Sequence, residues 1–187
     1  MAQPHPVSAE PLLDAALIAA WQRGDEQAAT ELVGRHARAL ARFLAGAGAP
    51  EADLDDLVQE TFIRAFRSMD RFRGQCQFRT WLLTIGGNVL KDHGRRASRR
   101  KVMPLDEAVR DGGGDPHELA EAREAEARLA AGLQELPRLQ REVFLLRAQQ
   151  GFDYEEIAVA LATTPGAARV HYHHAVRRLK DLIGGKL

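Results

Sequence analysis

The stretch LDDLVQETFIRAF, residues 54–66, decides the fold class of this chain because its apolar side chains recur at helical spacing. Successive apolar positions are separated by three residues and then by one, which aligns them along one side of an α-helix for about four turns. Asp56 and Glu60 are four residues apart and share a face beside that stripe. The apolar positions are Leu54, Leu57, Val58, Thr61, Phe62, Ala65, Phe66 and Met69.

The same spacing recurs along most of the chain, and the composition agrees with it. Of the 187 residues, 45% are hydrophobic and 28% are charged, which permits a packed core, whereas 6% aromatic residues are few for an all-β protein. We therefore expect an all-α fold. The further predicted helices cover residues 12–20, 25–46, 78–90, 119–136, 137–151, 153–161 and 165–179.

Composition also excludes several classes of protein. The single cysteine, Cys76, rules out an internal disulfide framework and any Cys-rich zinc or iron–sulfur site. The longest apolar run, residues 15–21, is too short to span a membrane, and residues 1–10 lack the basic and apolar regions of a signal peptide. We expect a cytoplasmic protein that does not insert into membranes.

One segment without helical periodicity divides the chain. Residues 102–117 contain Pro104, the run Asp-Gly-Gly-Gly-Asp at 111–115, and Pro116. Glycine and proline at this density are typical of a flexible linker. We therefore predict two small helical domains, residues 10–101 and 118–184.

The charges cancel overall but are segregated along the sequence. The 26 basic and 26 acidic residues give a formal net charge of zero. The charged residues within 51–60 are all acidic. Residues 91–101 are strongly basic, 106–126 are acidic, and 166–187 are basic again. Such blocks favour binding to polyanions by some segments and to basic partners by others. Solvated helix faces are the simpler alternative.

The C-terminal end has the pattern of a helix-turn-helix. A short helix over residues 153–161 is followed by a tight turn and then by a second helix, which Thr164 can cap and Pro165 can begin. Cationic and imidazole side chains on the second helix lie off its apolar stripe, where they could contact DNA. An ordinary helical hairpin remains the alternative. A histidine metal site is disfavoured because no third ligand is near in sequence.

Between residues 69 and 96, aromatic residues alternate with arginines. Bases of single-stranded nucleic acid can stack on the rings while the cations hold the backbone. Phe78 and Trp81 also lie on the apolar stripe of their predicted helix, so a role in the core is the alternative for both.

Several ordered motifs resemble bacterial sigma factors of the extracytoplasmic-function (ECF) group, which is group IV of the sigma-70 family. The resemblance covers about residues 10–100 and 118–183 in the same order. The matching segments are DDLVQETF (55–62), DRFRG (70–74), FRTWL (78–82), LP with REVFLLR (136–147) and GFDYEEIA (151–158).

This resemblance implies a sigma factor that binds the β and β′ subunits of core RNA polymerase and directs it to promoter DNA. The residues implied in polymerase docking are Asp55, Asp56, Leu57, Gln59 and Glu60. Those implied in recognition and melting of the −10 element are Arg71, Phe72, Arg73, Phe78, Trp81, Asn88, Arg95 and Arg96. Those implied at the −35 element are Thr164, Arg169, His171, His173, His174 and Arg177. An anti-sigma factor is a further expected partner.

The chain also departs from the common pattern of this group. Its last helix reads Gly-Ala-Ala-Arg-Val-His at 166–171 where relatives often have Gly-Thr-Val-Lys-Ser-Arg, so promoter preference does not transfer. Two other functions remain open from the residues alone. One is a helix-turn-helix regulator that never touches polymerase, and the other is a metal-dependent nuclease or phosphatase built on Asp53, Asp55, Asp56 and Glu60. We expect a protein without catalytic activity, cofactor or metal.

Overall fold

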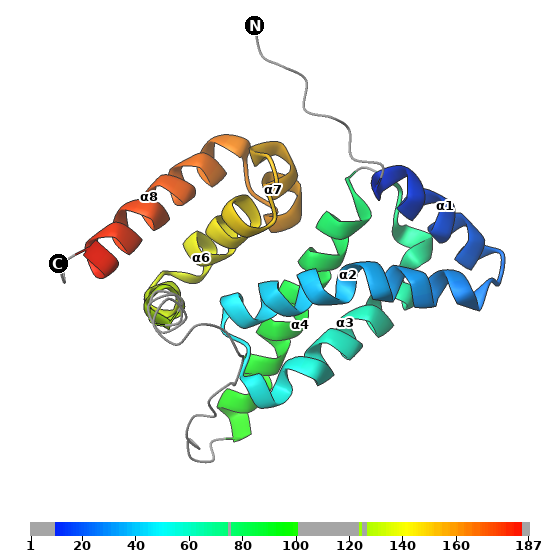
Figure 1. Cartoon of the computed structure of the whole chain (residues 1–187), viewed down its shortest axis with the longest axis horizontal. Helices are drawn as coiled ribbons and strands as arrows, with labels where there is room; N and C mark the ends of the chain where they lie inside the picture. Colours follow the sequence, from blue (N-terminus) through cyan, green and yellow to red (C-terminus); the bar gives the residue numbers. More distant parts are fainter. Residues whose placement is uncertain (1–9, 75, 101–123, 125–126, 185–187) are drawn as a thin grey trace, which may run out of the picture.

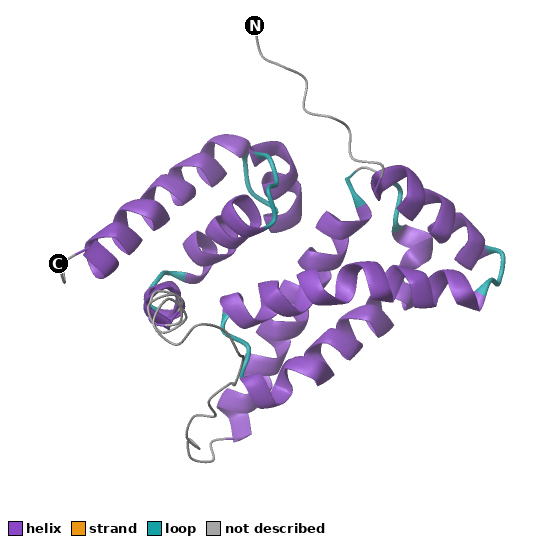
Figure 2. Cartoon of the chain, in the orientation of Figure 1, coloured by secondary structure: helices purple, strands orange, loops and turns teal. Residues whose placement is uncertain are grey.

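A computed structural model describes residues 10–74, 76–100, 124 and 127–184, and every regular element within these residues is helical (Figures 1 and 2). The predicted all-α class is therefore confirmed. The predicted linker, residues 102–117, lies outside the described residues. The elements are α1 (Glu10–Gln22), α2 (Glu26–Ala47), η1 (Glu51–Asp53), α3 (Leu54–Arg67), η2 (Met69–Arg71), α4 (Phe78–Arg100), α6 (Arg138–Phe144), η3 (Leu145–Gln149), α7 (Tyr154–Leu161) and α8 (Pro165–Gly184). Residues 127–134 are also helical.

Helix α2 is the centre of the first domain and packs against α1, α3 and α4. Its residues Leu40 and Leu44 are fully buried, as is Leu82 of α4. The two helices cross closely at Gly86, where an added Cβ would lie 2.8 Å from Cδ1 of Leu40. The sequence alone suggests that Gly86 weakens its helix. In the structure α4 runs unbroken through this residue, because the missing side chain permits the close crossing.

Helix ends follow the predicted capping chemistry. Asp25 accepts a hydrogen bond from the backbone N–H of Gln27 at 3.0 Å and begins α2. Asp153 and Glu156 form a reciprocal capping box at the start of α7. Thr164 Oγ1 accepts from the N–H of Ala167 at 3.1 Å and caps α8. These caps fix where three of the helices begin.

In the second domain, α6, α7 and α8 pack around a core that contains Leu146, Ile157 and Ala175. One element differs from the prediction. The single helix expected over residues 137–151 is an α-helix only to Phe144 and continues as a π-helical turn, η3. Within this turn the N–H of Gln150 reaches the carbonyl of Leu145 at 3.2 Å. Apolar periodicity does not distinguish the two helix types over so short a segment.

The two domains are in contact (Figure 1). Helix α4 packs on α7, and α2 packs on α6 and η3. The guanidinium of Arg79 donates to the side-chain carbonyl of Gln150 and lies 5.8 Å from the ring centre of Phe152. Arg141 Nη1 donates to the carbonyl of Ala47 at 2.9 Å. The buried residues of both domains consequently form one continuous cluster.

We expect Gly86→Val to lower the free energy of unfolding by about 1–3 kcal/mol, because the side chain would be forced against the buried Leu40. Gly34→Val is the matched control, since an added Cβ at Gly34 in α2 meets no atom within 4 Å. Urea denaturation followed by far-UV circular dichroism measures both variants. Equal destabilisation at the two sites would contradict the close crossing.

Candidate functional site

The predicted docking residues lie along α3 and divide by exposure. Asp55, Asp56 and Gln59 are exposed, and Glu60 is half-buried. Leu57 is only 4% exposed and belongs to the core. Its side chain therefore anchors α3 and is not presented to a partner in this arrangement.

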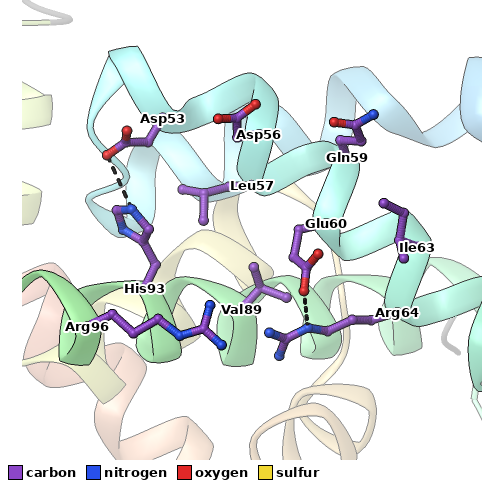
Figure 3. A pocket seen from close by; sticks show the side chains of 10 residues that line it. All are labelled: Asp53, Asp56, Leu57, Gln59, Glu60, Ile63, Arg64, Val89, His93 and Arg96. Atoms are coloured by element: carbon purple, nitrogen blue, oxygen red, sulfur yellow. Dashed lines mark hydrogen bonds and ion pairs between the residues drawn. The ribbon is translucent and has the colours of Figure 1, made fainter.

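A shallow hollow of about 300 Å³ separates this acidic face from α4 (Figure 3). On its far side, His93 Nε2 lies 3.4 Å from Oδ2 of Asp53. Arg96 also lines the hollow, although the resemblance places it among the −10 contacts. Part of the basic block at residues 91–101 thus faces part of the acidic block at 51–60 within the same domain.

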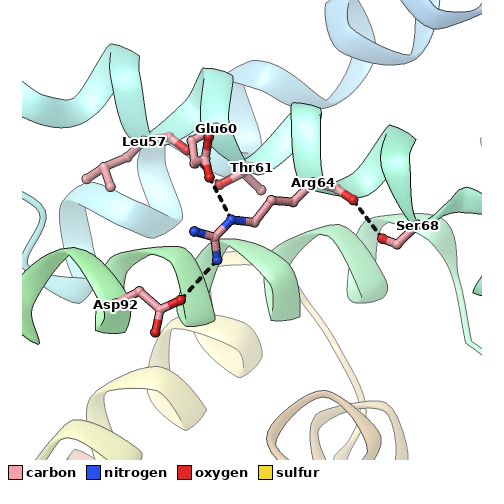
Figure 4. A network of polar contacts seen from close by, with 6 residues as sticks. All are labelled: Leu57, Glu60, Thr61, Arg64, Ser68 and Asp92. Carbon is pink, nitrogen blue, oxygen red and sulfur yellow. Dashed lines mark hydrogen bonds and ion pairs between the residues drawn. The ribbon is translucent and has the colours of Figure 1, made fainter.

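Arg64 links the two helices through a pair of carboxylates (Figure 4). Its Nε donates to Glu60 at 2.7 Å, and its Nη1 donates to Asp92 at 3.0 Å. These hydrogen bonds raise the pKa of Arg64 and, from the other side, lower the pKa of the Asp92 carboxyl. Glu60 is therefore already paired, which leaves Asp55 and Asp56 as the exposed acids of the predicted docking set. The spacing of Glu60 and Arg64 indicates this pair in sequence, whereas Asp92 becomes a partner only through packing.

The acids do not gather in the way that a metal centre needs. Within the described residues, no group of three or more His, Cys, Asp or Glu side chains could hold a metal ion. None of the described helices combines the length and the apolar composition that crossing a lipid bilayer requires.

The predicted −10 residues include three rings that the structure brings together. Phe72 and Trp81 have ring centres 5.2 Å apart, and Phe78 lies 5.9 Å from each of them. We call these three residues the aromatic cluster. Phe78 is 2% exposed, so it packs on the buried side of the other two rings. Its own ring is not accessible to a DNA strand. Phe72 and Trp81 are half-buried, and the neighbouring Arg71 and Arg73 are exposed.

Other members of that predicted set lie elsewhere. Asn88 follows Trp81 by two helical turns, a rise of about 10 Å along α4. It lines a hollow whose other wall is residues 159–162 of the second domain. Arg95 is exposed and lines a separate hollow between the domains. Cys76 is half-buried and lies two residues before Phe78 in sequence. Burial raises the pKa of its thiol.

The −35 residues predicted on α8 are mostly exposed. Arg169 lies with its guanidinium 5.0 Å from the ring centre of Tyr154, and Arg147 lies at the same distance from that ring. His171 is half-buried. Tyr154 is not among the predicted site residues, although an aromatic residue at the start of α7 is a signal for such stacking. The remaining exposed members are Thr164, His173, His174 and Arg177.

Comparisons with known proteins agree with this architecture. The family profile "Sigma-70 region 2" matches residues 32–100, and "Sigma-70, region 4" matches residues 126–179. The chain is 35% identical over 179 residues to RNA polymerase sigma factor NccH of Alcaligenes xylosoxydans xylosoxydans, covering 93% of this chain and 96% of that protein. It is 33% identical over 170 residues to the ECF RNA polymerase sigma-E factor of Escherichia coli strain K12, covering 86% and 88%.

Solved structures give the same fold. CnrH, in complex with the cytosolic domain of CnrY, is similar with a TM-score of 0.70 and 30% identity, over 96% of this chain and 100% of that chain. RpoE of Bartonella quintana, in complex with the anti-sigma factor NepR, shares the fold at a TM-score of 0.67 and 23% identity, over 84% and 98%. The chain therefore belongs to the sigma-70 family, as an ECF RNA polymerase sigma factor that directs promoter-specific initiation of transcription and is not an enzyme.

Proposed function

We propose that the first domain docks on core RNA polymerase through Asp55 and Asp56, and that its aromatic cluster captures an unstacked base of the −10 element. The second domain would read the −35 element through α8. The observation that carries the proposal is the arrangement of Phe72 and Trp81, which are half-buried, in ring contact and flanked by the exposed Arg71. The proposed functional units are residues 10–101 and 118–184, joined by 102–117.

The docking step rests on the charge that α3 leaves unpaired. Arg64 occupies Glu60, and His93 occupies Asp53, while no ion pair is found for Asp55 or Asp56 among the described residues. Opposite charges across an interface steer association and fix its register. The two exposed acids therefore suit a basic surface on the β′ subunit of polymerase.

The base-capture step rests on the depth of the rings. A fully exposed ring would have no neighbouring side chains to enclose a base. A fully buried ring such as Phe78 cannot be reached by a base. Phe72 and Trp81 lie between these limits, and the buried ring beneath them keeps their spacing. Exposed arginines at residues 71 and 73 supply the positive charge that a strand backbone requires.

Asn88 would act only after the two domains move apart. It faces the hollow of about 290 Å³ whose opposite wall is formed by residues 159–162. Asn88 is itself exposed, but a strand that follows α4 from Trp81 to Asn88 would meet that wall. This role therefore presumes that the domain contact opens when the factor joins polymerase.

The −35 step rests on α8 and on its partner ring. Thr164 caps the helix, so its N-terminal half is fixed to the turn that precedes it. Arg169 is exposed in that half and stacks on Tyr154, which limits the positions its guanidinium can take. In helix-turn-helix proteins this half of the second helix enters the major groove. We propose that Arg169 contacts a base edge there.

We further propose an anti-sigma factor as a partner and the cytoplasm as the site of action. The likeness to CnrH, which was solved with the cytosolic domain of CnrY, supports a protein partner of this kind. A role in promoter-directed transcription supports the cytoplasm, because a bacterial cell holds its DNA and RNA polymerase in that compartment.

For docking, we expect Asp56→Arg to weaken binding to core polymerase at least about fivefold near physiological salt, because it places a cation against a basic surface. Fluorescence anisotropy of the labelled chain measures the affinity. Glu31→Arg makes the same change of charge at an exposed position of α2 and serves as the control. Equal affinities for the two variants would remove Asp56 from the interface.

For base capture, we expect Phe72→Ala to leave polymerase binding intact and to reduce open-complex formation about ten- to a hundredfold, since stacking contributes about 1–3 kcal/mol per base. Phe72→Tyr keeps a stacking ring and should retain melting. Asn88→Ala should also reduce melting. Permanganate footprinting of the melted strand is the measurement, and wild-type reactivity in Phe72→Ala would refute the assignment.

For the −35 element, we expect Arg169→Ala to cost about 1–3 kcal/mol of promoter binding and to relax preference at one base pair. The comparison uses holoenzyme on promoters with single −35 substitutions, at two salt concentrations. Lys180→Ala, on the C-terminal half of the same helix, is the control. If Arg169→Ala weakens all sequences alike and lowers the salt slope by about one, the contact is to phosphate and the base assignment is wrong.

A further inference from the structure

A buried polar pair lies beneath the aromatic cluster and is not used by docking or by DNA binding. Asp14 of α1 and His36 of α2 are each 4% exposed. Their side chains meet at 2.9 Å, between Oδ2 of Asp14 and Nε2 of His36. Arg35 Nε donates to the other carboxylate oxygen of Asp14 at 3.1 Å.

Stability alone does not explain this pair. Replacing a buried ionic pair by apolar residues of similar volume is often neutral or stabilising, because removing the groups from water is costly. Apolar side chains could fill this position, since α2 buries Leu32 and Leu40 completely elsewhere along its length. The pair instead sets the orientation of the His36 side chain. A carboxylate oxygen can only accept, so Nε2–H of His36 donates to it and the plane of the imidazole is fixed.

The fixed imidazole touches the buried ring of the aromatic cluster. The ring centres of His36 and Phe78 are 5.3 Å apart with their planes at 64°, an edge-to-face contact. Phe78 in turn meets Phe72 at 88° and Trp81 at 44°. The contacts thus run from Asp14 through the two buried rings to the two half-buried ones.

Phe72 depends on these ring contacts because regular backbone hydrogen bonds do little to hold it in place. It lies at the end of η2, where its N–H donates to the carbonyl of Met69 at 3.1 Å. The chain then passes through Gly74, at a φ of +68°, before α4 begins. Outside a regular helix, the ring contacts determine where this side chain points.

We propose that Asp14 and His36 are positioning residues that hold the aromatic cluster in the geometry that receives a promoter base. This inference rests on the proposed base capture by Phe72 and Trp81. Neither Asp14 nor His36 touches DNA. Their effect passes through Phe78.

The experiment compares variants of the full chain, assembled with core polymerase, in permanganate footprinting. His36→Leu removes both the donor and the ring edge and should lower open-complex formation about three- to tenfold, while core affinity stays within about twofold. Asp14→Asn keeps the shape of the side chain but removes its charge, and should have a smaller effect. His36→Gln keeps an N–H that can reach Asp14 but offers Phe78 no ring edge, so it should recover only part of the loss. If His36→Leu does not fold, Asp14→Asn and His36→Gln carry the test, and wild-type melting in both variants would overturn the inference.

A spectroscopic readout separates positioning from general damage. The chain has two tryptophans, so Trp21→Phe leaves Trp81 as the only source of the tryptophan bands in near-UV circular dichroism. His36→Leu in this background should reduce the Trp81 signal. The control is Thr61→Val, since Thr61 is fully buried in the same domain and its hydroxyl donates only within α3, to Leu57 at 2.6 Å. Thr61→Val should change neither the signal nor melting.

The outcomes distinguish this inference from the function on which it rests. If Phe72→Ala melts the promoter normally, base capture is wrong and the inference is overturned with it. If Phe72→Ala loses melting but His36→Leu does not, only the inference is overturned. It is also overturned if His36→Leu lowers core affinity as much as melting, or leaves the Trp81 signal unchanged.

Discussion

Helix α4 crosses α2 so closely at Gly86 that a single methyl group would meet Leu40 at 2.8 Å. Because both helices are fully buried at Leu40 and Leu82, this crossing fixes the direction of α4 within the domain. The start of α4 then carries Phe78 and Trp81 to one surface. Its second half carries Asp92 and His93 to another, against the acidic face of α3. The aromatic cluster therefore lies at the start of α4, and the acidic face of α3 that we propose for docking packs beside its second half.

The alternating charge blocks serve both the fold and its partners. Part of the acidic block at 51–60 faces the segment 91–101 inside the first domain, where Asp53 pairs with His93. Glu60 of the same block pairs with Arg64 within α3. Arg64 reaches Asp92 on α4 as well. These ion pairs are only partly buried, so water and salt screen them and they contribute modestly to stability. Asp55 and Asp56 take no part in these pairs, which is why we propose them for docking.

The contact between the domains includes a residue next to the aromatic cluster. Arg79, which lies between Phe78 and Trp81 in sequence, reaches across to Gln150 and Phe152. Burial at this contact also lowers the pKa of Arg141, whose guanidinium donates to the carbonyl of Ala47. Taking guanidinium groups out of water is costly unless their hydrogen bonds are satisfied. The contact between the domains therefore combines these guanidinium hydrogen bonds with the apolar cluster that the two domains share.

Much of this molecule follows from local sequence. Apolar spacing identifies the helices, and Asp25, Asp153 and Thr164 mark where three of them begin, because capping and amphipathicity involve residues only a few positions apart. The ordered motifs identify the family for the same reason. Tertiary packing decided the rest: that Phe72, Phe78 and Trp81 form one cluster, that Gly86 is a crossing point, and that the helix after Pro137 widens into a π turn. It also decided that Asp14 meets His36, because such contacts join residues whose separation in sequence carries no periodic signal.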